Sequence, residues 1–158
     1  MNIFAATGHR PEKLGGHGEQ TDARLRRLAA WFFATNRPDK VISGMALGWD
    51  MAWAEAAIEA RIPVIAAVPF GGQESRWPAI SQDRFWRILV QCEEVVIVCD
   101  GTYAAWKMQK RNQWMVDKAS HLIALWDGTS GGTANCVSYA DGRIPTHNLW
   151  SYWSSNAF

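Results

Sequence analysis

The sequence lacks an excess of charge of either sign, and it lacks any long apolar run. In a chain of 158 residues, 16 Lys and Arg nearly balance 15 Asp and Glu. Such a balance provides no electrostatic footprint for duplex or single-stranded nucleic acid or for an anionic membrane. No stretch approaches the roughly 18 apolar residues of a membrane span, and residues 1–6 lack the basic start of a signal peptide. We therefore expect a cytoplasmic protein without a membrane or nucleic-acid partner.

Cysteine is also scarce. Cys92, Cys99 and Cys136 are odd in number and show no metal-type spacing, which indicates buried thiols in a reducing compartment. Internal repeats, low-complexity tracts and long charge runs are absent, so we expect a single domain over residues 1–158. Tryptophan, in contrast, is abundant: ten residues are too many for all to be fully buried, and several are expected in a pocket or a subunit contact.

Short apolar runs alternate with segments of helical spacing. The runs, which predict strands, are residues 3–6, 40–43, 63–68, 95–99, 121–126 and 147–150. This alternation predicts an α/β fold, a three-layer sandwich in which helices cover both faces of a mainly parallel sheet. An aromatic tail from about residue 150 shows no periodicity, and we expect it to dock on the body or on a second subunit of a symmetric homodimer.

Two glycine-rich turns follow predicted strands, at residues 43–50 (SGMALGWD) and 127–133 (DGTSGGT). Glycine lets the backbone approach a ligand closely, and the first N–H groups of the following helix are unpaired. Each turn is therefore a candidate anion site, and two of them indicate a nucleotide-sized ligand. We assign the phosphate to Gly44, Gly131, Gly132 and Thr133, together with Arg10.

Ligands of parallel sheets bind beyond the carboxyl ends of the strands, which selects further candidates. These follow the first four predicted strands, and they are Gly8, His9, Arg10, Ser43, Gly44, Gly48, Asp50, Phe70, Gln73, Trp77, Tyr103, Arg111 and Asn112. We expect the aromatic rings of Phe70, Trp77 and Tyr103 to stack on a base. No metal site and no cofactor are expected.

Four of these candidates have two possible roles. His9 is either a structural, hydrogen-bonded histidine or a ligand contact, and Arg10 is either a surface charge or a bidentate phosphate ligand. Asp50 is either the N-cap of a helix or an acceptor for a ribose hydroxyl. Arg111 lies either on a helix exterior or in the pocket. In the common doubly wound order the first and fourth strands flank the switch point, so we expect Arg10 and Arg111 to converge on one anion.

Taken in order, these motifs resemble one family. Between about Ile3 and Ala140, the chain is similar to the YpsA-like branch of the SLOG superfamily in five motifs: Thr7-Gly8-His9-Arg10-Pro11, Gly44-x-x-x-Gly48-x-Asp50, Pro69-Phe70 with Gln73 and Trp77, Arg111-Asn112-x-Trp114-Met115-Val116-Asp117 and Gly131-Gly132-Thr133. The resemblance implies a Rossmann-like fold, a pocket for a nucleotide or nucleotide-derived ligand, and oligomerisation. The superfamily includes LOG enzymes, which cleave the base–ribose bond of nucleoside monophosphates. It also includes DprA proteins, which bind single-stranded DNA, and domains that sense or process NAD-derived nucleotides.

One departure from the LOG enzymes bears on activity. Those enzymes carry a catalytic glutamate shortly after the glycine–threonine motif, whereas Thr133 is followed by Ala-Asn-Cys-Val and no carboxylate until Asp141. Glycosidic cleavage requires a carboxylate. We therefore expect a protein that senses or sequesters a nucleotide, such as an NAD-derived or cyclic signalling nucleotide, and turns it over slowly or not at all. The alternative is an N-glycosidase of nucleoside monophosphates or NAD-like substrates, with Glu74 or Asp50 supplying the carboxylate.

Overall fold

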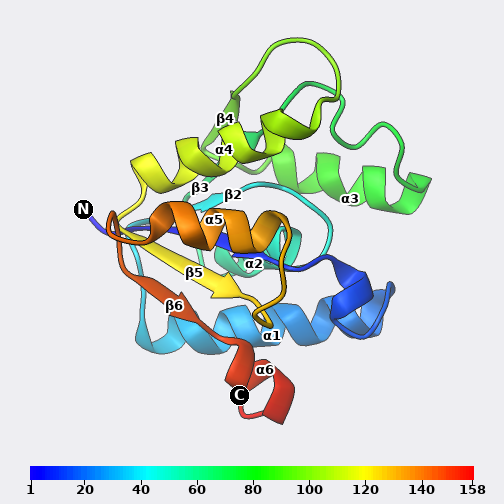
Figure 1. The fold of residues 1–158 in the computed structure, drawn as a ribbon. Coiled ribbons are helices and arrows are strands. Elements are labelled where there is room, and N and C mark those ends of the chain that lie inside the picture. Colours follow the sequence, from blue (N-terminus) through cyan, green and yellow to red (C-terminus); the bar gives the residue numbers. More distant parts are fainter.

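The computed structural model describes all 158 residues and contains one six-stranded sheet in which every neighbouring pair of strands is parallel (Figure 1). The strands are β1 (Ile3–Gly8), β2 (Lys40–Ser43), β3 (Val64–Val68), β4 (Glu94–Ile97), β5 (His121–Leu125) and β6 (Thr146–Asn148). All six predicted strands are present, and the predicted Rossmann-like α/β fold is confirmed.

Helices cover both faces of this sheet and bury two separate cores. They are α1 (Glu19–Thr35), α2 (Trp49–Glu59), α3 (Ala79–Leu89), α4 (Ala105–Lys118), α5 (Gly132–Ala140) and α6 (Trp150–Ser155). The larger core joins α1, α2, α3 and α6 to one face, and the smaller core joins α4 and α5 to the other (Figure 1). Strands buried on both faces need apolar residues at every position, which β3 (VIAAV) provides. None of the helices combines the length and apolar character that a bilayer crossing requires.

The order of the strands is β4-β3-β2-β1-β5-β6, and it corrects one expectation. The chain adds β2, β3 and β4 outward on one side of β1, and α4 then returns it to β5 on the other side. The switch point therefore lies between β1 and β5, whereas β4, which we expected there, is an edge strand. The sequence predicts the strands themselves, but their lateral order depends on tertiary packing.

The C-terminal tail takes one of the two arrangements that we expected for it. Residues 150–155 form the short helix α6, which is too brief to show a periodic pattern. The Trp153 side chain is 4% exposed and belongs to the larger core. Arg24 of α1 lies over its ring, 3.8 Å from the centroid, and Arg24 Nη2 donates a hydrogen bond to the Trp153 carbonyl oxygen (2.5 Å). The tail therefore docks on the body of its own chain.

Candidate functional site

A cavity of about 410 Å³ opens beyond the carboxyl ends of β1 and β5, at the switch point of the sheet. This volume lies within the range of small-molecule sites, about 300–1,000 Å³. The cavity brings together many of the predicted residues, from the end of β1 and from α2, α4 and α5. They are Gly8, His9, Arg10, Asp50, Arg111, Asn112, Gly131, Gly132 and Thr133.

The start of α5 leaves donors free at this cavity. No hydrogen bond of the protein uses the backbone N–H groups of Gly132, Thr133 and Ala134. A Cβ atom added at Gly131 or Gly132 would meet nothing within 4 Å, so the space beside both glycines is open. Of these two glycines, Gly131, the N-cap residue, has a positive φ (140°) and Gly132 does not. The second glycine turn therefore has the geometry of an anion site.

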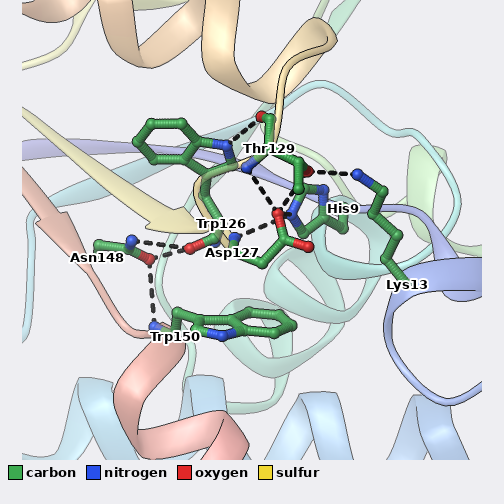
Figure 2. A network of polar contacts seen from close by, with 7 residues as sticks. All are labelled: His9, Lys13, Trp126, Asp127, Thr129, Asn148 and Trp150. Atoms are coloured by element: carbon green, nitrogen blue, oxygen red, sulfur yellow. Dashed lines mark hydrogen bonds and ion pairs between the residues drawn. The ribbon is translucent and has the colours of Figure 1, made fainter.

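The loop that leads into α5 is held by Asp127 (Figure 2). Asp127 Oδ1 accepts hydrogen bonds from the backbone N–H (3.0 Å) and the hydroxyl (2.5 Å) of Thr129, and it lies 2.8 Å from His9 Nε2. Lys13 Nζ donates to the same Thr129 hydroxyl oxygen. The Thr129 donors, followed by His9, hold the pKa of Asp127 well below its usual range. His9 is 7% exposed and lines the cavity as a hydrogen-bonded residue that fixes this loop.

The other end of the loop is fixed by β6 (Figure 2). Asn148 Nδ2 donates to the Trp126 carbonyl oxygen (2.9 Å), and Asn148 Oδ1 accepts from the N–H groups of Trp126 and Trp150 (both 3.2 Å). The Trp150 ring packs edge-on against the His9 ring, with centroids 5.8 Å apart. The sequence reasoning missed these supporting residues. The spacing of Asp127 and Thr129 was a usable signal, because an Asp side chain often accepts from the N–H group two residues later.

A buried pair of opposite charges, Arg111 and Asp50, lies at the floor of the cavity. Arg111 and Asp50 are each 5% exposed. Arg111 Nη1 donates to the carbonyl oxygens of Gly44 (2.5 Å) and Ala67 (3.3 Å), and Nε donates to Asn112 Oδ1 (3.2 Å). Burial raises the pKa of Asp50 to about 6, although the Arg111 charge opposes this rise. Burial lowers the pKa of Arg111, and the Asp50 charge opposes that shift. Arg111 is therefore a pocket residue and not a helix-surface charge.

Asp50 is not the N-cap of α2. The helix begins at Trp49 with Gly48 as N-cap, no side chain caps it, and Asp50 lies in the first turn. The Asp50 Oδ1 atom is buried and has no hydrogen-bond partner. The carboxylate is therefore part of the cavity and not part of the helix end.

Three residues of the first glycine turn lie outside the cavity that we expected them to line, although Ala46 and Asp50 of the same turn line it. Ser43, Gly44 and Gly48 do not line the cavity. A Cβ on Gly44 would lie 2.6 Å from Arg111 Nη1, and a Cβ on Gly48 would lie 2.6 Å from the His9 carbonyl oxygen. The Ser43 hydroxyl donates to the Asp50 carbonyl oxygen (2.8 Å). The two glycines therefore allow a close approach between parts of the chain itself. The expectation was wrong because the sequence alone does not distinguish a close approach to a ligand from one to a side chain.

The predicted aromatic residues line a second, adjoining cavity of about 490 Å³. Phe70, Trp77 and Tyr103 lie on its walls with Gln73, and the Phe70 and Tyr103 rings pack edge-on, 5.9 Å apart. Gln73 Nε2 donates to the Gly44 carbonyl oxygen (3.3 Å), whereas Gln73 Oε1 is buried without a partner. Arg10 and Met108 line both cavities, which are therefore neighbouring parts of one site.

Of the two carboxylates proposed to replace the missing glutamate, only Asp50 reaches this site. Glu74 is buried and lines neither cavity. Glu12 adds a second carboxylate to the first cavity, where it accepts a hydrogen bond from His17. No three His, Cys, Asp or Glu side chains are grouped closely enough to hold a metal ion.

Comparison with known proteins places this architecture in a family. The chain is 32% identical over 127 residues to the uncharacterized SPbeta prophage-derived protein YoqJ of Bacillus subtilis, covering 70% of this chain and 74% of YoqJ. Its fold is similar to DNA processing protein A (DprA) of Streptococcus pneumoniae, with a TM-score of 0.68 and 14% identity over 93% of this chain and 50% of that one. DprA of Helicobacter pylori, whose structure was described for its single-stranded DNA binding mode, gives a TM-score of 0.65 and 15% identity over 93% of this chain and 64% of that one. A model of the YspA SLOG family matches residues 4–141, and the chain therefore belongs to this family, to which YpsA gives its name.

Proposed function

We propose that the protein binds a nucleotide or a nucleotide-derived small molecule, such as an NAD-derived or cyclic signalling nucleotide, and senses or sequesters it. One observation carries the proposal: the three free N–H groups at the start of α5 face a cavity that is also lined by Arg10, Lys13 and Arg111. Helix N-termini favour anions through these N–H groups and the helix dipole, and the cationic side chains add to that preference.

The second cavity supports a nucleotide over a simple phosphate. It adjoins the phosphate position through Arg10 and Met108 and presents the aromatic rings of Phe70, Trp77 and Tyr103. Aromatic side chains stack on any of the nucleotide bases. A phosphate at α5 and a base in the second cavity would thus be joined by a ribose that crosses between them.

A second candidate function is favoured by the Asp50 carboxylate. Its oxygen without a partner and its raised pKa are properties of acid–base residues, and it lines the phosphate cavity, where the ribose of a nucleotide would lie. An N-glycosidase acting on a nucleoside monophosphate or an NAD-like substrate is therefore the alternative. Release of free base from AMP or NAD at about 1 per second or faster would favour this alternative.

Single-stranded DNA is not part of the proposal. The H. pylori protein with that activity is 15% identical, which relates the two folds only. The near balance of 16 basic and 15 acidic residues also provides little attraction for a polyanion.

The binding test compares two valine substitutions in α5 by calorimetric titration with AMP and ADP-ribose, preceded by native mass spectrometry of the purified protein. Gly132→Val fills the open space in front of the N–H groups without requiring a positive φ, so the fold is retained. Affinity should fall tenfold or more, which corresponds to roughly 1.4 kcal/mol. Asn135→Val is the control, because Asn135 is an exposed residue of the same helix outside both cavities. If Gly132→Val and Asn135→Val bind the nucleotides with equal affinity, the assignment of the phosphate to the start of α5 is wrong.

A further inference from the structure

Three buried side-chain atoms make no hydrogen bond in the protein, and two of them belong to residues that line the site. These two are Asp50 Oδ1 and Gln73 Oε1, one from each cavity. A buried acceptor without a donor is unfavourable, and more so if it is charged. A ligand that supplies donors at these places would remove the deficit.

The Asp50 carboxylate is held in a fixed position. A Cβ on Gly44 would lie 2.8 Å from Asp50 Oδ2, so the carboxylate packs directly against the Gly44 backbone. Arg111 is in turn anchored to the carbonyl oxygens of Gly44 and Ala67. Asp50 therefore presents an acceptor at a defined place in the cavity floor.

An ionised carboxylate only accepts hydrogen bonds and repels phosphate, so Asp50 does not bind the anion held by α5. Gln73 lies next to it through Gly44, whose carbonyl oxygen accepts from both Gln73 Nε2 and Arg111 Nη1. Gln73 and the aromatic rings occupy the second cavity, where the base is proposed to lie. Of the parts of a nucleotide that lie between phosphate and base, the ribose hydroxyls are the hydrogen-bond donors.

We infer that the Asp50 carboxylate accepts a hydrogen bond from the 2′-hydroxyl of the bound ribose, so that the site selects ribonucleotides over 2′-deoxyribonucleotides. This inference rests on the proposed nucleotide binding and adds the class of nucleotide to it. A 2′-deoxy ligand leaves the buried acceptor without a donor, and it should bind roughly 10- to 100-fold more weakly, the usual effect of a lost hydrogen bond to a charged group. The same preference excludes DNA as the ligand of this site.

The test titrates the wild-type protein with the matched pairs AMP and dAMP, GMP and dGMP, and CMP and dCMP. The readout is the ratio of the two dissociation constants within a pair. If Asp50 had a purely structural role, its substitution would change both affinities and leave this ratio unchanged. Asp50→Asn keeps the shape but replaces the charged acceptor with a neutral amide oxygen, so the ratio should fall severalfold. Glu12→Gln is the matched control: it removes the other carboxylate of the cavity, one that is exposed, and the ratio should remain as in the wild type.

The outcomes distinguish failure of the 2′-hydroxyl inference from failure of the proposed nucleotide binding. A wild-type ratio near one overturns the inference and leaves nucleotide binding intact, even if Asp50→Asn does not fold. A ratio that Asp50→Asn leaves unchanged also overturns it. If none of the six nucleotides binds, and ADP-ribose and cyclic AMP do not bind either, the proposed function is refuted, and the inference with it. If a single-stranded deoxyribonucleotide oligomer competes with AMP and binds with equal or higher affinity, the ligand of the site is DNA and the inference is overturned.

Discussion

The substitution Gly8→Ala should strongly destabilise the fold, although Gly8 lines the cavity. A Cβ at Gly8 would lie 2.5 Å from Cδ1, 2.7 Å from Cβ and 2.8 Å from Cγ of Trp49. The Trp49 side chain has no exposed surface and packs on Trp53, with ring centroids 5.7 Å apart. Its indole Nε1 also donates to the Ile123 carbonyl oxygen (3.4 Å). The tryptophan therefore has no space to move into, and β1 and α2 must separate.

The expected magnitude follows from this overlap. Extra atoms in a well-packed core cost about 1–3 kcal/mol, and the immobile partner places Gly8→Ala in the upper part of that range. For a chain of this size each kcal/mol lowers Tm by about 2–4 °C, so we expect a decrease of roughly 4–12 °C.

Thermal unfolding followed by circular dichroism measures the effect, and Gly132→Ala is the matched control. A Cβ at Gly132 meets nothing within 4 Å and φ is not positive there, so Tm should remain unchanged or rise slightly. A Gly8→Ala variant that melts within about 1 °C of the wild type would refute the packing argument, since 1 °C corresponds to less than about 0.5 kcal/mol.

Three further predictions concern pH, the α5 loop and assembly. Because burial raises the folded pKa of Asp50 from 3.8 to about 6, the folded state holds this proton more tightly than the unfolded state. The stabilising contribution of this proton is full below the unfolded pKa and is lost as the pH rises through about 6. Between pH 4 and 7, the free energy of unfolding measured with denaturant should therefore decrease less steeply with pH for Asp50→Asn than for the wild type. Asp127→Ala removes the acceptor for both Thr129 donors and should weaken AMP binding roughly fivefold, or about 1 kcal/mol, whereas Asp127→Asn keeps the acceptor and most of the affinity; equal affinities in calorimetry would contradict this role of the loop. We also expect a homodimer, since Trp86 of α3, Val90 at its end and Ile97 of the edge strand β4 leave apolar surface exposed; a monomeric mass by light scattering at micromolar concentration would contradict it.

The inner strands β1, β2, β3 and β5 were predictable from sequence, because their burial on both faces requires apolar residues almost without interruption. The runs at 63–68 and 121–126 each contain the observed strand, β3 and β5, with one extra residue. Helix α6 was not predictable in this way, because six residues are fewer than two turns and its aromatic side chains hide any pattern. Its position depends on Arg24 of α1, which is distant in sequence.

The site was predictable where a feature is local. The turn at Gly131 and Gly132 needed only glycines at the start of a helix, and the structure leaves open space there. The role of Gly44 was not predictable, because its neighbour Arg111 comes from another strand–helix unit. The same limit applies to the strand order. Because β4 is an edge strand, Arg111 does not enter the cavity from a switch point beside β4; its guanidinium group contacts the carbonyl oxygen of Ala67 in β3.

The central position of β1 has a consequence for how the chain folds during synthesis. β1 is made first, yet one of its two neighbours, β5, ends only at Leu125. At about 5–20 residues per second, the ribosome needs roughly 6 to 23 s to make the chain between Gly8 and Leu125. During this time β1 to β4 are able to assemble, but β1 keeps an open edge able to pair with other chains. A nascent chain that pauses between α4 and β5 is therefore most exposed to aggregation, and ribosome-bound chains ending before residue 121 should bind chaperones more strongly than chains that include β5.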